Sequence, residues 1–167
     1  ADWARRVGAL SDGIRALLAV VVAEGGPAVA DHFYGVMLED PRAERYLDVD
    51  QVRERLKPSL QRWLAALLAA RPGDIDALQA TQEHVGQVHA RIGIPVDLVA
   101  RGGRMLKDDL HAGIRRHAGS DRLALDAIVC ADGLVDIALE SMTRAYTRSR
   151  EAAGQVDGAF RLFSLIQ

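Results

Sequence analysis

Residues that break helices divide this chain into segments. They are gathered at Gly25-Gly26-Pro27, Asp40-Pro41, Arg71-Pro72-Gly73 and Gly93-Ile94-Pro95. Proline disfavours the helical conformation of the residue before it, and glycine commonly ends a helix. Between these breaks the apolar residues recur at helical spacing, and no alternating run of four or more residues indicates a strand. The chain is therefore predicted to be all-α, with six or seven helices.

The predicted helices lie between the breaks. One starts at Pro27, which suits the first position of a helix, and ends before Pro41. Others cover about residues 51–70, 74–92, 96–118 and 122–150, and the opening stretch before Gly25 brings the number to six or seven. Residues 48–50 supply candidate N-caps, and Pro58 is expected to kink the helix that it lies in. The polar, glycine-containing residues 151–158 are expected to form a linker.

The composition excludes several classes of protein. A single cysteine, Cys130, leaves no disulfide within the chain and no cysteine-based zinc site. Twenty-one basic and 23 acidic residues give a net charge of −2, which argues against a broad nucleic-acid surface. No signal-peptide pattern opens the chain, and the longest apolar run, residues 14–23, is too short to span a bilayer. We therefore expect a cytoplasmic domain with neither a nucleic-acid nor a membrane partner.

Apolar residues mark one face of each predicted helix. The faces are Ala30, Phe33, Tyr34 and Met37; Val52, Leu56, Leu60, Trp63 and Leu67, with Ser59 at the edge; and Leu78, Thr81, Val85, Val88 and Ile92. The last helix has two stripes: Ile128, Val135, Leu139, Met142 and Tyr146, and then Ala127, Leu134, Ala138 and Ala145. Because a helix needs one stripe to face its own core, the second is expected to contact another chain. Gly102-Gly103 is expected to mark a close helix crossing.

The five histidines do not form a zinc pair. His84 and His89 are five residues apart, so their side chains diverge by about 140° on a helix. His89 is expected to point partly into the interior, about 55° from the centre of its apolar stripe. It is either a core histidine bonded to a carbonyl group or a metal ligand. A metal held by one histidine must bring its own equatorial ligands, as haem iron does, and residues 51–70 and 74–92 offer apolar faces for a haem slot.

Two hydroxyl groups are candidate donors on the other side of such an iron. Tyr34 lies on an otherwise apolar face, and Ser59 lies at the edge of another. In a purely structural role, each would bond a backbone group or water. The sequence contains no Walker A, G-x-S-x-G, H-E-x-x-H or G-x-G-x-x-G motif. These residues therefore favour a binding domain over an enzyme.

The residues around His89 resemble those of a known family. Residues 88–95 read Val-His-Ala-Arg-Ile-Gly-Ile-Pro, which resembles the proximal-histidine signature of globin-coupled sensors. The resemblance extends in order over His32-Phe33-Tyr34, residues 40–47, Leu56-Lys57, Arg62-Trp63, residues 142–146 and residues 160–165. It covers nearly the whole chain.

The resemblance implies a globin sensor domain with an additional N-terminal helix in residues 1–150, and a connector in residues 151–167. It implies haem b with His89 as the iron ligand, Tyr34 as the distal hydrogen-bond donor, Leu56 as an apolar gate and Ser59 as a second donor. We expect Phe33, Leu60, Trp63 and Val85 to complete the pocket. Dioxygen is the implied ligand, CO and NO are further candidates, and a homodimer is implied through the last two helices.

In this family the ligand regulates a C-terminal output domain, such as a diguanylate cyclase that makes cyclic di-GMP from GTP. The chain contains no GG(D/E)EF motif, so the chain itself is not expected to be the catalyst. Because it ends inside an apolar stretch, we expect it to be part of a longer protein. Three alternatives stay open: a haem-free dimerisation module, the sensor of a histidine kinase or chemoreceptor, and an independent oxygen-carrying globin.

Overall fold

The computed structural model describes the fold of residues 1–166 and the side chains of residues 1–154. Within this part the chain is helical and has no strand, which confirms the all-α prediction. The α-helices are α1 (Asp2–Gly8), α2 (Asp12–Leu38), α3 (Val49–Gln51), α4 (Lys57–Leu68), α5 (Ile75–Ile92), α6 (Val96–His117) and α7 (Asp121–Ile166). Two short 3-10 helices, Ala43–Arg45 and Pro72–Asp74, and a π-helical turn, Val52–Leu56, complete the order.

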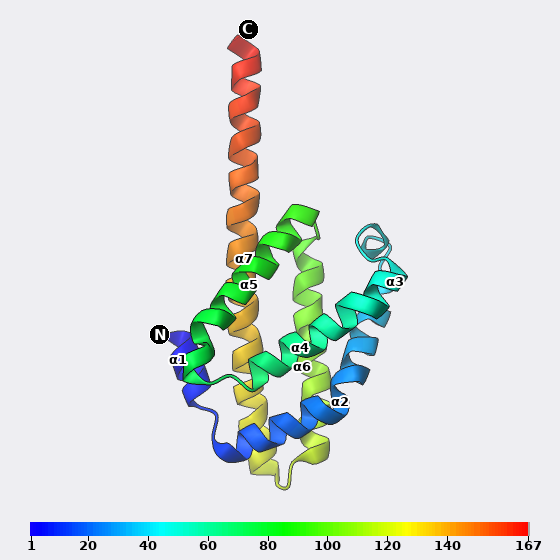
Figure 1. Cartoon of the computed structure of the whole chain (residues 1–167), viewed down its shortest axis with the longest axis vertical. Coiled ribbons are helices and arrows are strands. Elements are labelled where there is room, and N and C mark those ends of the chain that lie inside the picture. Colours follow the sequence, from blue (N-terminus) through cyan, green and yellow to red (C-terminus); the bar gives the residue numbers. More distant parts are fainter. Residues whose placement is uncertain (167) are drawn as a thin grey trace.

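The helix α7 is the axis of the molecule. The other helices gather around its first half, and its C-terminal half extends beyond them (Figure 1). The main helix pairs are α5 with α7, α2 with α4, α2 with α6, and α6 with α7. The turn after α4 sends the chain back along α5, and the two helices diverge from it (Figure 1). This divergence separates the far ends of α4 and α5.

The hydrophobic core lies where these helices meet α7. Its fully buried members include Leu18 of α2, Leu67 of α4, Ile114 of α6 and Leu134 of α7. Each buried leucine or isoleucine stabilises the fold by about 1.5–3 kcal/mol relative to an exposed one. The N-terminal helix α1 joins this core through Trp3 and Val7. The additional helix is therefore part of the domain.

The predicted break at Gly25-Gly26-Pro27 is wrong, because α2 continues through it. The side chain of Ser11 caps α2 by accepting a hydrogen bond from the backbone N–H of Ile14, and Pro27 lies inside the helix. An interior proline costs about 3 kcal/mol. Residues on both sides of Pro27, such as Leu18 and Met37, are buried, while Pro27 itself is exposed. Burial along the whole helix offsets the local cost.

Among the described helices, α2 has the length and hydropathy of a membrane span. It packs on α4 and α6, and Leu17, Leu18 and Val21 on one side of it lie in the core. The core helix of a globular domain passes the same test.

The chain before α4 bends differently from the prediction. Asp48 caps α3 as predicted, accepting hydrogen bonds from the N–H groups of Asp50 and Gln51. The interior kink expected at Pro58 is replaced by the π-helical turn Val52–Leu56. Pro58 lies in the first turn of α4, where its missing N–H costs little.

The C-terminal part departs from two further expectations. Residues 151–158 are helical within α7, whereas their composition predicted an irregular linker. The stripe of Ala127, Leu134, Ala138 and Ala145, which was expected to face another chain, is buried in this chain's own core. The reason is that α7 is surrounded by α1, α5 and α6, so it needs more than one inward face. The connector side chains of residues 155–167 lie outside the described residues.

The close crossing expected at Gly102-Gly103 is confirmed. A Cβ atom on Gly102 would lie 2.8 Å from Cε2 of Phe33, and one on Gly103 would collide with Leu139. Both glycines are buried. The missing side chains let α6 approach α2 on one side and α7 on the other.

Candidate functional site

The buried face of α5 is rotated from the predicted stripe. Leu78, Gln82, Gly86 and Ala90 are buried, whereas Thr81 is exposed and Ile92 is 50% exposed. The centre of the buried face therefore lies closer to His89 than the centre of the predicted stripe does. Gln82 is buried, and His89 lies two turns after it on the same face of α5. His89 therefore points inward more directly than the sequence predicted.

One side of α5 packs directly on α7. Gly86 lies so close to the carbonyl oxygen of Met142 that a Cβ atom would overlap it, and that Cβ would lie 3.1 Å from the Cβ of Ala145. Beside this contact, Oε1 of Gln79 accepts hydrogen bonds from Nε1 of Trp3 at 2.6 Å and from Oγ of Ser141 at 3.1 Å. The contact thus joins α1, α5 and α7.

The other side of α5 faces α4 through one hydrogen bond. Nε1 of Trp63 donates to Oε1 of Gln82 at 2.8 Å. Seven residues make about two helical turns, so residues seven apart lie close to the same helix face. Leu56 lies seven residues before Trp63, and His89 lies seven residues after Gln82. Both therefore lie close to the faces that carry this hydrogen bond. Helices α4 and α5 diverge in this direction (Figure 1). We call the region between Leu56, just before α4, and His89, near the end of α5, the slot.

The candidate pocket residues around this slot are only partly buried. They are Phe33, Leu56, Leu60, Trp63 and Val85. All five are large and apolar, yet none reaches the burial of the core leucines. Partly buried apolar side chains of this kind favour the binding of an apolar ligand.

His89 is partly buried, and its inner nitrogen has no hydrogen bond within residues 1–154. Its Nδ1 atom is buried and has no partner among the described residues. Burial lowers the pKa of His89 below its ordinary value, so the imidazole is neutral at neutral pH. The structure therefore does not show the carbonyl-bonded core histidine that was one of the two interpretations. A neutral imidazole is the form that binds a metal.

Tyr34 keeps its proton over the whole physiological range. Burial raises the pKa of its phenol to about 12, so the group is a hydrogen-bond donor at neutral pH. Its ring meets the ring of Phe33 edge to face, with the centroids 5.0 Å apart. Phe33 in turn lies against Gly102 of α6. The close crossing of α2 and α6 thus fixes the segment that carries the phenol.

Ser59 lies at an exposed position of α4. Its Oγ atom accepts a hydrogen bond from Arg62 at 3.0 Å. This placement gives no support to Ser59 as a second donor in the slot.

The other histidines have ordinary surroundings. His32, His111 and His117 pair with Asp109, Asp132 and Glu24 at 2.7, 2.6 and 3.3 Å, and each pair joins two helices. His84 is exposed. In residues 1–154, no three His, Cys, Asp or Glu side chains gather as a metal site.

The sequence did not reveal two contacts near the end of α5. Asp40, which resembled a solvated helix end, is 9% exposed and accepts hydrogen bonds from Arg42 and Arg101. These bonds lower the pKa of Asp40 to about 2. The hydroxyl of Tyr146 donates to the carbonyl oxygen of Ile94 at 2.7 Å. The bonds of Arg101 to Asp40 and of Tyr146 to Ile94 join distant parts of the sequence, and no local pattern indicates either.

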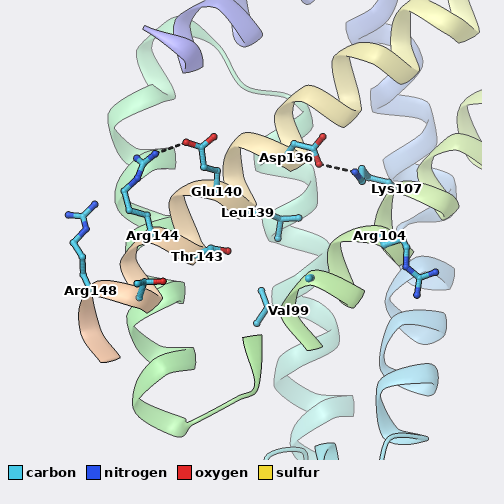
Figure 2. A pocket seen from close by; sticks show the side chains of 11 residues that line it. Val99, Arg104, Lys107, Asp136, Leu139, Glu140, Thr143, Arg144 and Arg148 are labelled. Carbon is cyan, nitrogen blue, oxygen red and sulfur yellow. Dashed lines mark hydrogen bonds and ion pairs between the residues drawn. The ribbon is translucent and has the colours of Figure 1, made fainter. Parts of the chain in front are cut away.

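A groove of about 680 Å³ runs between α6 and α7, away from the slot (Figure 2). None of the predicted pocket residues lines it. Two ion pairs lie along it: Lys107 with Asp136 at 2.8 Å and Arg144 with Glu140 at 2.5 Å (Figure 2). The groove and the slot are separate features.

Comparison with known proteins decides the family. Residues 11–152 match the protoglobin family. The chain belongs to the protoglobin family. This protoglobin is 36% identical over 166 residues to the diguanylate cyclase DosC of Escherichia coli K12, and equally to DosC of Shigella sonnei. The match covers 99% of this chain but only 36% of each relative.

Solved structures confirm the globin fold of this protoglobin. The ferric crystal form of the globin domain of E. coli DosC superposes with a TM-score of 0.80 at 35% identity, covering 85% of this chain and 95% of that one. The globin domain of a Geobacter sulfurreducens globin-coupled sensor superposes with a TM-score of 0.68 at 23% identity, covering 81% and 90%. The resemblance to globin-coupled sensors is confirmed.

Proposed function

We propose that this protoglobin domain is a haem-based oxygen sensor. The observation that carries the proposal is His89, a neutral imidazole with a buried, unpartnered nitrogen at the side of an apolar slot. The globin domain of DosC, a protein described as a diguanylate cyclase, supports the same conclusion by its similarity.

The residues present fit haem b. His89 would hold the iron, and Phe33, Leu56, Leu60, Trp63 and Val85 would pack on the porphyrin. When bound, the haem supplies a ferrous iron that binds dioxygen, and CO or NO in its place. The apolar side chains exclude water, which strengthens every hydrogen bond made inside the slot.

Tyr34 is proposed to recognise the ligand. Its phenol keeps the proton on the hydroxyl oxygen and donates it as a hydrogen bond to dioxygen, which carries partial negative charge when bound. CO carries less charge on its outer atom, so the same donor favours dioxygen. Leu56 is proposed to limit the entry of water on this side.

The proposal is tested by replacing the iron ligand. His89→Ala is expected to abolish the Soret band of the reconstituted protein or to shift it, because no other described histidine lies at the slot. His84→Ala is the matched control, since His84 is exposed on the same helix. An unchanged spectrum in His89→Ala would overturn the proposal, as would a parent chain that takes up no haem, which would favour the haem-free alternative.

We propose that residues 1–150 form the sensor and that residues 151–167 lead to an output domain. The chain spans 36% of the length of the E. coli relative DosC, which is named a diguanylate cyclase. The proposed output is the conversion of GTP to cyclic di-GMP in the cytoplasm; a histidine kinase or a chemoreceptor is the alternative. Assay of the full-length protein with GTP, with and without oxygen, decides between them.

We propose that the domain dimerises through α6 and α7. The support is the groove between these helices, because the small-residue stripe is buried within the chain (Figure 2). Thr143→Arg would place a bulky charge in the groove, and sedimentation velocity is expected to show a monomer. Leu125→Arg, at an exposed position near the start of α7, is the control and is expected to leave the dimer intact.

A further inference from the structure

The turn after the proposed iron ligand is built directly on His89. Helix α5 ends at Gly93, whose φ of 84° is in the left-handed region that favours glycine. The backbone N–H groups of Gly93 and Ile94 both donate to the carbonyl oxygen of His89, each at 3.0 Å. Any displacement of the His89 backbone therefore moves Ile94 with it.

The helix α7 holds this turn from one side. The hydroxyl of Tyr146 donates to the carbonyl oxygen of Ile94 across 52 residues of sequence, in a partly buried position. The acceptor is a backbone atom, so the hydrogen bond holds the backbone of the turn at Ile94 and not only a side chain. Tyr146 thus ties the turn to the longest helix of the domain.

The end of α2 holds the region from the other side. The carboxylate of Asp40 accepts from Nε and a terminal nitrogen of Arg42 at 3.1 and 3.0 Å, and from Arg101 of α6 at 3.1 Å. Arg42 also donates to Asp97, two residues after Pro95, at 2.9 and 3.2 Å. Helix α2 ends two residues before Asp40, and it carries Tyr34.

Asp40 is the residue on which the hydrogen bonds of Arg42 and Arg101 mainly depend. Exposed ion pairs contribute little, and the side chain of Asp97 is 61% exposed. Asp40 is shielded and is shared by two guanidinium groups, which makes its hydrogen bonds charge-assisted. Its loss would release Arg101 and leave Arg42 with the exposed Asp97 as its partner.

We propose that Tyr146 and Asp40 are positioning residues. They hold residues 93–97 in place, and we call this segment the junction because it connects the His89 side of the slot, the Tyr34 side of the slot and α7. The inference rests on the proposed function, because it assigns His89 to the haem. Asp40 fixes the end of the helix that carries the Tyr34 donor against the start of α6. Tyr146 couples the turn behind His89 to α7 and adds a hydrogen bond to the direct packing of α5 on α7.

The first test needs no haem. The amides of Gly93, Ile94 and Leu98 all donate to carbonyl groups of this region, so their hydrogen exchange reports on the junction. In the apo chain we expect Tyr146→Phe and Asp40→Asn each to speed this exchange by about threefold or more, the range expected for one lost hydrogen bond. Exchange as slow as in the parent in both variants would overturn the proposal.

Two controls make the test specific. Tyr46→Phe removes the hydroxyl of a tyrosine that makes none of the junction's hydrogen bonds, and Asp50→Asn breaks an exposed ion pair within one segment. Both are expected to leave the exchange of these amides unchanged. Faster exchange in the controls as well would show a general loosening and would overturn the assignment to Tyr146 and Asp40.

The second test uses the haem-loaded chain. Tyr146→Phe is expected to shift the iron–histidine stretching frequency of the ligand-free ferrous form, and Asp40→Asn to change mainly the dissociation rate of dioxygen. If the parent binds no haem, the proposed function fails while the exchange result still stands. If haem and dioxygen bind normally, and neither the frequency nor the rate changes in these variants, the junction is overturned and the proposed function survives.

Discussion

The two sides of α5 differ in how completely their groups are packed and bonded. Towards α7, Gly86 is buried in direct contact with the neighbouring helix, and Gln79 is hydrogen-bonded to Trp3 and Ser141. Towards the slot, Val85 and Val88 are only partly buried and Nδ1 of His89 lacks a partner. We therefore infer that the fully packed and hydrogen-bonded side of α5 serves the fold, and that the partly buried side serves binding.

The largest effect is expected on the packed side. In Gly86→Ala the new Cβ atom would overlap the backbone carbonyl of Met142, which cannot move as a flexible side chain can. The free energy of unfolding, measured by urea denaturation of the apo chain, is expected to fall by about 2–3 kcal/mol. Gly35→Ala is the control, because its Cβ would meet nothing within 4 Å and is expected to stabilise α2 by about 0.5–1 kcal/mol. Equal stabilities for the two variants would remove the distinction between the two sides.

The second-largest effect is expected from the hydrogen bond between Trp63 and Gln82, where α4 and α5 are joined. Trp63→Phe leaves the buried Oε1 of Gln82 without a donor and is expected to cost about 1–3 kcal/mol in urea denaturation. Trp3→Phe is the matched change on the packed side. It is expected to cost less, because Oε1 of Gln79 keeps its hydrogen bond from Ser141. The reverse order would show that the slot end depends less on hydrogen bonding than we infer.

A smaller effect is expected from the ligand donor. In the reconstituted protein, Tyr34→Phe removes one hydrogen bond to dioxygen, and stopped-flow measurement is expected to show dissociation about three- to tenfold faster. The urea stability of the apo chain is expected to change little, because the phenol of Tyr34 makes no hydrogen bond that the fold of residues 1–154 needs. A dissociation rate equal to that of the parent would exclude Tyr34 as the donor.

The smallest effect concerns pH. Burial lowers the pKa of His89 in the folded chain, so the unfolded chain takes up the proton first and stability falls as the pH drops through the ordinary value of 6.5. His89→Gln is expected to lose less stability than the parent between about pH 7.5 and pH 5.5 in urea denaturation. His32→Gln is expected to do the opposite, because a hydrogen bond to Asp109 raises the pKa of His32, and that stabilisation is lost as the pH rises. Parallel pH curves for all three proteins would contradict both signs.

The sequence predicted the elements of this fold that depend on local chemistry. Helix spacing, the Asp48 cap and the Gly93-Ile94-Pro95 break are properties of adjacent residues, and each is present in the structure. The inward direction of His89 also followed from spacing along one helix. Its unpartnered nitrogen did not, because a hydrogen-bond partner can come from anywhere in the fold.

The errors arose where tertiary contacts outweigh local preference. Pro27 stays within α2 because both ends of that helix are buried, which no pattern near Pro27 indicates. Periodicity showed that Ala138 and Ala145 form a stripe but not which helix covers it. Arg101, one of the two partners of Asp40, lies 61 residues away, and the partner of Tyr146 lies 52 residues away, so both could be found only in three dimensions.

The unbroken course of α7 has a mechanical consequence. With 46 residues and a rise of about 1.5 Å per residue, the helix is about 69 Å long. Its first half is held by the body of the domain, while the remainder projects from it (Figure 1). Such a rod acts as a lever: a tilt of about two degrees where it leaves the domain carries the tip of its projecting half, about 34 Å long, through about 1.2 Å, by the same rise per residue. Displacements too small to alter the core are therefore magnified along the rod.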